Sequence, residues 1–199
     1  MKLFIAAILA TSSTFFPRGA LADLTVSDVV TNVGIVTSVS GNLNSVLSGL
    51  TTSSSSSQVR TIGQSVVTDL ETIISSLSGD VTAMQPTPPF GNMDALLIVQ
   101  SLDQFVAIHQ ALLSTVIGKH GIFAQFGVTQ PIADVLRNLE AGIDSFAFAM
   151  IAMIPTQTPS VNADKGSLDS SVGNTISLYQ QLCIPSVLYP TLMPICVSL

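Results

Sequence analysis

Lys119 and His120 stand together in the stretch LLSTVIGKHGIFAQFG (residues 112–127), between an apolar helical run and two phenylalanines, Phe123 and Phe126. This arrangement allows two interpretations. At the end of a helix, the two basic side chains would interact favourably with the negative end of the helix dipole, and this is the interpretation we prefer. In a binding site, the Lys119 ammonium would instead hold the carboxylate of a lipid whose tail runs past the two phenyl rings.

Catalytic chemistry finds little support in the sequence. The chain has two histidines, and it contains no G-x-S-x-G nucleophile motif, no H-E-x-x-H zinc motif and no glycine-rich phosphate-binding loop. His109 lies on the apolar stripe of a predicted helix, where a partly buried histidine bonded to a neighbouring carbonyl is the ordinary arrangement. We therefore expect a protein that is not an enzyme and that has no cofactor and no metal site.

The two cysteines, Cys183 and Cys196, enclose 12 residues that include three prolines. Residues 1–22 have the features of a secretory signal peptide: a lysine, a short apolar run and a final Ala-Leu-Ala. Cysteines that enter an oxidising compartment form disulfides, so we predict a structural disulfide between them, worth about 3 kcal/mol by chain entropy. Alternatively, the small residues at 170–174 and the uncharged end of the chain outline a signal for a glycolipid anchor.

The composition favours an apolar partner. Beyond the predicted signal peptide the chain holds 4 basic and 12 acidic residues, a net charge of −8, which makes nucleic acid a poor partner. Only 9% of the residues are charged whereas 47% are hydrophobic, which indicates an apolar ligand or an apolar surface. Because no later apolar run is long enough to cross a bilayer, we expect no transmembrane segment in the mature chain.

Apolar residues recur at steps of three and four along most of the chain, a pattern that predicts helices. The predicted fold class is all-α, an antiparallel helical bundle with four core helices, a weaker C-terminal helix and an irregular tail. We expect the core helices over residues 26–50, 59–84, 92–121 and 131–154, and the weaker one over 168–183. The predicted organisation is a signal peptide (1–22), a helical bundle domain (23–157) and a C-terminal extension with the cysteine-closed loop (158–199).

The run SFAFAMIAMI (residues 145–154) is apolar nearly all round a helix. Such a helix is usually buried on all sides. Its phenylalanines and methionines also suit a cavity between helices, because flexible methionines adapt to a variable apolar guest. Both interpretations stay open, and the candidate ligand-binding residues are Phe105, Lys119, Phe123, Phe126, Phe146 and Met150.

The order of these features resembles the fungal family of hydrophobic surface-binding protein A and related cell wall galactomannoproteins. The resemblance covers roughly residues 24–154 and is clearest at ALLSTVIGKHGIF (111–123), where family members show a leucine-rich helix, a lysine pair and a nearby phenylalanine. Lys119 matches the first family lysine, His120 replaces the second, Gly121 stands where proline is common, and Phe123 keeps the aromatic. The cysteine-bounded tail is not part of the family pattern.

The resemblance implies a secreted, non-enzymatic helical protein that adsorbs to hydrophobic surfaces. In some relatives such a protein recruits polyester-degrading hydrolases, and in others it holds a fatty acid between its helices. We therefore expect an extracellular or cell wall protein whose partner is a hydrophobic surface or a fatty acid or lipid, with a secreted polyester hydrolase as a further partner. The alternative is a structural cell wall mannoprotein, held by O-linked sugar on the Ser/Thr-rich linker at 51–57 or by a glycolipid anchor, that binds no small molecule.

Overall fold

The computed structural model describes residues 23–198, so the predicted signal peptide lies outside the described residues. The prediction of an all-α helical bundle is confirmed. A 3-10 turn, η1 (Pro155–Gln157), joins the last two helices, and two short strands follow them, β1 (Leu182–Ile184) and β2 (Ile195–Val197). The helices are α1 (Val26–Ser48), α2 (Ser56–Met84), α3 (Asn92–Gln125), α4 (Thr129–Met153) and α5 (Thr158–Tyr179).

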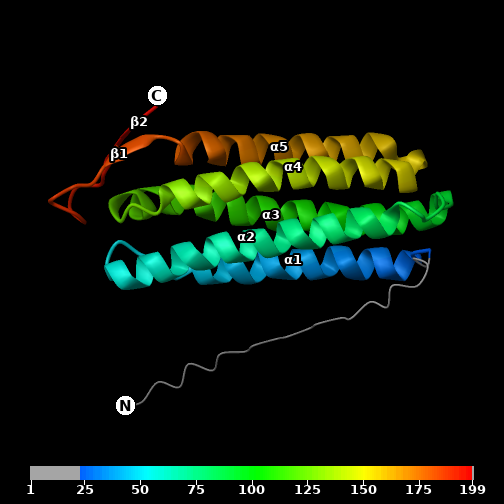
Figure 1. The fold of residues 1–199 in the computed structure, drawn as a ribbon, viewed down its shortest axis with the longest axis horizontal. Coiled ribbons are helices and arrows are strands. Elements are labelled where there is room, and N and C mark those ends of the chain that lie inside the picture. The colour runs from blue at the N-terminus through cyan, green and yellow to red at the C-terminus, as the bar shows by residue number, and fades with distance from the viewer. Residues whose placement is uncertain (1–22, 199) are drawn as a thin grey trace, which may run out of the picture.

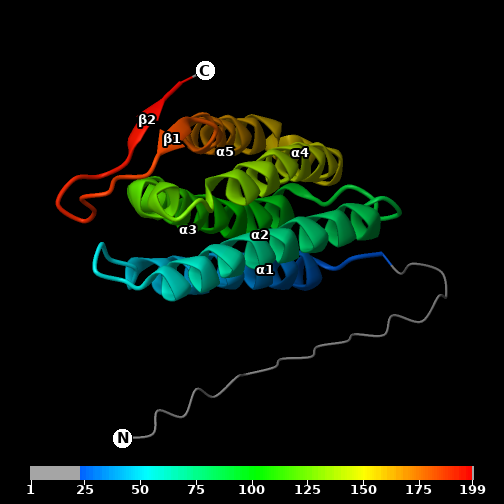
Figure 2. The same ribbon diagram turned by 60° about the vertical axis from the view of Figure 1, so that its left-hand side comes forward.

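The five helices run up and down along one long axis (Figure 1). α1 packs against α2 and α3, α4 packs against α2 and α5, and α5 also packs against α3. The helices therefore form a ring in the order α1, α3, α5, α4, α2. A view turned by 60° shows α4 and α5 on one side, α1 and α2 on the other, and α3 between them (Figure 2). Apolar side chains from all five helices meet in one core.

Local sequence signals set several helix ends. At the start of α1, the Asp28 backbone N–H donates to the Thr25 hydroxyl, and the Thr25 N–H donates to the Asp28 carboxylate, which completes a capping box. At the start of α2, the Gln58 N–H donates to the Ser55 hydroxyl. Gly127 turns the chain between α3 and α4 with a φ of +69°, which glycine adopts without strain.

α3 continues past the glycine-rich stretch where the sequence pattern predicts its end. It extends to Gln125, so the prediction of a helix end at residues 118–121 is wrong. A glycine inside a helix costs about 1 kcal/mol relative to alanine, and the burial of Phe123 in the core outweighs that cost. Lys119 and His120 therefore lie within a helix, and the preferred interpretation of this pair as a helix-end corner is also wrong.

α3 is long and apolar enough to cross a bilayer by its length and composition. In the structure its apolar side chains contribute to the core, and the helix packs between α1 and α5. The core helices of bundles pass the same test of length and composition, so this single helix is a weak indication of a membrane span.

α5 begins at Thr158, ten residues before its predicted start. Pro159 occupies its first turn, where proline is tolerated because the first backbone N–H groups of a helix have no partner within the helix. The early turns of α5 are polar, which is why the apolar pattern misses them. The apolar side chains that α5 contributes to the common core are Val161, Leu168, Val172, Ile176 and Tyr179.

Gly166 and Gly173 weaken α5 without any packing reason. A Cβ at either position would meet no heavy atom within 4 Å. We predict that Gly166→Ala raises the free energy of unfolding by about 1 kcal/mol and the thermal midpoint by about 2–4 °C, as measured by circular dichroism. Gly63→Ala is the matched control, because at this buried position of α2 its Cβ would lie 3.3 Å from Val128 Cγ2, so the substitution should gain less. An unchanged midpoint for Gly166→Ala would count against this account of α5.

The C-terminal tail is more regular than its prolines indicate. β1 and β2 pair antiparallel, with Cys183 opposite Cys196. These two cysteines form the predicted disulfide, with their Cα atoms 4.0 Å apart. We call residues 182–197 the tongue. It lies at the end of the bundle where α3 and α5 end (Figures 1 and 2).

Candidate functional site

An apolar cleft lies between α3, α4 and α5. Its aliphatic and aromatic lining includes Leu102, Phe105, Ile143, Phe146, Met150 and Leu168, and the partly buried Asp164 and Lys165 complete it. The free volume inside the cleft is about 10 Å³. This volume holds about one water molecule, so the cleft is closed in the present conformation.

Three of the six residues predicted to contact a ligand line this cleft. Phe105 comes from α3, and Phe146 and Met150 lie one turn apart on α4. All three are almost fully buried. The structure therefore brings together residues that are 41 to 45 positions apart in the chain, and their role as ligand contacts remains a prediction.

The other three predicted residues lie toward the far end of α3. The Lys119 ammonium donates a 2.8 Å hydrogen bond to the carbonyl of Leu50, just beyond the end of α1. Phe123 and Phe126 pack against the two tyrosines of the chain, with ring centroids 6.4 and 5.6 Å apart. Lys119 thus holds the end of α1 and is not among the residues that line the cleft.

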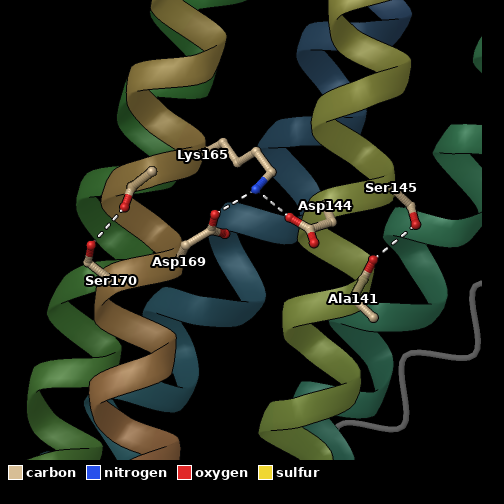
Figure 3. A network of polar contacts seen from close by, with 7 residues as sticks. Ala141, Asp144, Ser145, Lys165, Asp169 and Ser170 are labelled. Carbon is tan, nitrogen blue, oxygen red and sulfur yellow. Dashed lines mark hydrogen bonds and ion pairs between the residues drawn. The ribbon is translucent and has the colours of Figure 1, made fainter.

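Lys165 is the basic residue that lines the cleft. Its ammonium lies 2.6 Å from a carboxylate oxygen of Asp144 on α4 and 2.6 Å from one of Asp169 on α5 (Figure 3). Hydrogen bonds to these two carboxylates, of which the one to Asp144 has the larger effect, raise the pKa of Lys165 to about 12. In the sequence, the i,i+4 spacing to Asp169 signals an ion pair, but no pattern places Lys165 beside α4.

Asp164 adds a titratable group next to Lys165. Burial, followed by the negative charge of Asp103 and a hydrogen bond with it, raises the pKa of Asp164 to about 6. This carboxyl is therefore partly protonated in mildly acidic solution. The rim of the cleft combines a permanent cation with an acid whose charge depends on pH.

His109 and Ser40 form a buried pair between α3 and α1, with Nδ1 and Oγ 3.0 Å apart. A serine beside a histidine is also the starting geometry of nucleophilic catalysis. Here both side chains are fully buried, and the Ser40 hydroxyl also donates to the Val36 carbonyl. His109 is thus fully rather than partly buried, its partner is a hydroxyl in place of the predicted carbonyl, and the pair is closed to solvent.

His120 and the two cysteines form the single group of potential metal ligands within residues 23–198. His120 Nε2 lies 3.8 Å from Cys183 Sγ. Because thiolates rather than disulfide sulfurs bind metals, the group is not a metal site while the disulfide is formed. His120 also packs edge-on against Tyr179 at the end of α5, with ring centroids 4.9 Å apart, so it contacts both α5 and the start of the tongue.

A second, wider groove of about 500 Å³ lies between the start of α4 and the end of α5. Its lining side chains are polar, and Arg137 among them already pairs with Asp134. A polar lining does not suit a hydrocarbon chain. The cleft is therefore the better candidate for an apolar ligand.

A ring of helices with an apolar cleft between α3, α4 and α5 defines a helical bundle whose candidate binding site lies between helices. Residues 26–152 match the family model described as hydrophobic surface binding protein A, so the chain belongs to this family. The predicted family resemblance is confirmed. The match ends before α5 and the tongue. No match to a curated protein sequence was found.

Three solved structures share the fold. A structure of AFMP4P in complex with palmitic acid has a TM-score of 0.69 and 12% identity, covering 78% of this chain and 99% of that chain. A structure of ligand binding domain 2 of Penicillium marneffei MP1 protein with multiple arachidonic acids has a TM-score of 0.65 and 14% identity, covering 79% and 96%. A second structure of that domain with arachidonic acids has a TM-score of 0.65 and 14% identity, covering 79% and 94%.

Proposed function

We propose that this protein binds a long-chain fatty acid in the cleft between α3, α4 and α5, in addition to binding hydrophobic surfaces as its family description states. The observation that carries the proposal is an apolar cleft with one cation, Lys165, among its lining residues. The structural neighbours support it, because structures of the same fold hold palmitic acid and arachidonic acids.

The two ends of a fatty acid match two parts of the cleft. The hydrocarbon chain would pack against Phe105, Phe146 and Met150, and each Å² of apolar surface removed from water contributes about 25 cal/mol. The carboxylate would replace Asp144 at the Lys165 ammonium, so that one charged contact is exchanged for another. Lys165 would take the anchoring role that the second interpretation of the sequence gave to Lys119.

Ligand uptake requires the cleft to open, because its present volume of about 10 Å³ is far too small for a fatty acid. α5 is the helix that we expect to move. Its contacts with α3 include hydrogen bonds from the Gln110 amide to the hydroxyls of Ser167 and Ser171, at 2.8 and 3.1 Å. Such surface bonds are exchanged for bonds to water at small cost. The isolated glycines within α5 lower its stability further.

Secretion remains part of the proposal, supported by the signal pattern at residues 1–22. The protein would then act outside the cell or in the cell wall. Recruitment of a secreted polyester hydrolase is a prediction from the family alone. A structural mannoprotein of the cell wall is the second candidate, favoured by the largely exposed Ser/Thr-rich residues 51–57, and detergent-resistant retention in the wall fraction would support it.

Fluorescence of a conjugated polyene fatty acid, which rises when the probe leaves water, tests fatty-acid binding. The chain contains no tryptophan, so the intrinsic fluorescence of the protein interferes little. We expect saturable binding of the probe and its displacement by palmitate. A signal that does not saturate, or that palmitate fails to displace, would contradict the proposal.

A further inference from the structure

The tongue carries much of the apolar side-chain surface that the described residues expose. It forms less than a tenth of the described chain, yet it holds eight of the fifteen large hydrophobic side chains that the described residues expose. These are Leu182, Ile184, Val187, Leu188, Leu192, Met193, Ile195 and Val197. The tongue contains no charged residue. Exposed apolar side chains gathered in one short segment indicate an interaction site.

The hairpin of β1 and β2 exposes its apolar face to solvent, which is the reverse of the usual orientation of a sheet. Leu182 lies opposite Val197 and Ile184 lies opposite Ile195, so one face of the hairpin carries four aliphatic side chains. These four are more than half exposed, whereas the disulfide lies on the inward face, beside His120. An antiparallel sheet normally packs its apolar face on the core and leaves its polar face in water.

Several contacts hold the tongue in place while its apolar residues stay exposed. The Gln125 side chain of α3 donates to the Ser186 carbonyl at 3.0 Å and accepts from the Ser186 N–H at 2.8 Å. Phe126 packs edge-on against Tyr189, with ring centroids 5.6 Å apart, and the disulfide closes the base. A surface held in its binding shape loses little conformational entropy when it docks.

We propose that the tongue is the element that anchors this protein to a surface of bare hydrocarbon, such as a solid or liquid alkane. The tongue has no lysine or arginine to pair with phosphate head groups, and residues 23–198 carry a net charge of −8, so a phospholipid surface offers no electrostatic gain. An uncharged surface matches an uncharged tongue. This inference rests on the surface-binding part of the proposed function and is independent of the fatty-acid cleft.

The test compares two variants of the full chain. In the tongue variant, Leu182, Ile184, Ile195 and Val197 are all replaced by threonine, which keeps the preference for strands. In the control variant, four exposed aliphatic residues of α1 and α3 are replaced by glutamine, namely Ile35, Met93, Leu96 and Leu97. Adsorption to an alkane-coated sensor should weaken by about tenfold or more in the tongue variant alone, while its thermal midpoint and palmitate binding stay unchanged.

Every outcome bears on the proposal. A second tongue variant, Val187→Ser with Leu188→Ser, leaves the strands intact and should also weaken adsorption. Full adsorption by both tongue variants, or an equal loss in the control, would overturn the inference. The proposal is also wrong if wild type binds phosphatidylcholine vesicles as tightly as alkane, since the tongue then binds lipid membranes. It is equally wrong if wild type is a dimer that the tongue variants dissociate, since the tongue then binds a second copy of the chain. A wild-type chain that does not adsorb overturns the surface-binding function, whereas failure of palmitate binding removes only the cleft.

Discussion

Lys165→Met is expected to raise the dissociation constant for palmitate by about tenfold or more. The substitution removes the cation that pairs with the ligand carboxylate, in a bond of about 1.5–3 kcal/mol, and leaves the carboxylates of Asp144 and Asp169 to repel the ligand. Methionine keeps the apolar stem of the side chain. The affinity for hexadecanol, which has the same chain without the carboxylate, should change much less. Displacement of the polyene fatty acid from each variant measures both ligands. Lys119→Met is the matched control, since its ammonium bonds the Leu50 carbonyl instead of lining the cleft.

The same contacts predict the reverse effect for a neighbouring residue. Asp144→Asn removes a carboxylate that competes with the ligand for the Lys165 ammonium, so palmitate should bind more tightly. Lys119→Met should leave palmitate affinity unchanged and lower the stability by about 1 kcal/mol, the value of one hydrogen bond. If palmitate and hexadecanol weaken equally in Lys165→Met, the substitution damages the cleft as a whole, and the anchor role is wrong.

Between pH 7 and pH 4, wild type should lose about 3 kcal/mol more of its free energy of unfolding than His109→Leu loses. Burial lowers the pKa of His109 from 6.5 to about 4. Below pH 6.5, His109 therefore binds a proton in the unfolded chain but stays neutral in the folded chain. The free energy of unfolding falls as the pH drops toward 4. Leucine removes this penalty. Urea unfolding at pH 7, 5.5 and 4 measures the difference.

The comparison with wild type is needed because other groups act in the opposite direction. Burial raises the pKa of Asp80 and of Asp164 to about 6, so these carboxyls favour the folded state as the pH falls through 6. Ser40→Ala is the control, since it removes the hydrogen bond to His109 and leaves the imidazole buried. It should keep the acid sensitivity of wild type. Parallel pH profiles for His109→Leu and wild type would show that His109 is not the sensitive group.

The ring of helices could be predicted where a regular apolar stripe meets local capping signals. Ser40 falls at a step of the first stripe where an apolar residue is missing, and the structure buries it as the pattern predicts. The end of α3 could not be predicted in this way. Its glycines are a valid local signal for a helix end, but the burial of Phe123 stabilises a further turn of the helix. That burial depends on residues distant in sequence, such as Gly63 and Tyr179.

The candidate site was predictable in its apolar part and not in its charged part. Phe146 and Met150 stand out because their helix is apolar on nearly all sides, and both line the cleft. Lys165 lies in the polar stretch ADKGSLDSS, and its partner Asp144 belongs to another helix. Which lysine reaches a cleft depends on how helices pack, and a single sequence carries no direct signal of that packing.

Native mass spectrometry of the full-length mature protein after incubation with palmitate tests the central claim most directly. The account predicts a mass excess of one palmitate that disappears under denaturing conditions and that is strongly reduced in Lys165→Met. A wild-type protein that shows no such excess, at palmitate concentrations that saturate the displacement assay, would contradict a fatty acid bound between α3, α4 and α5.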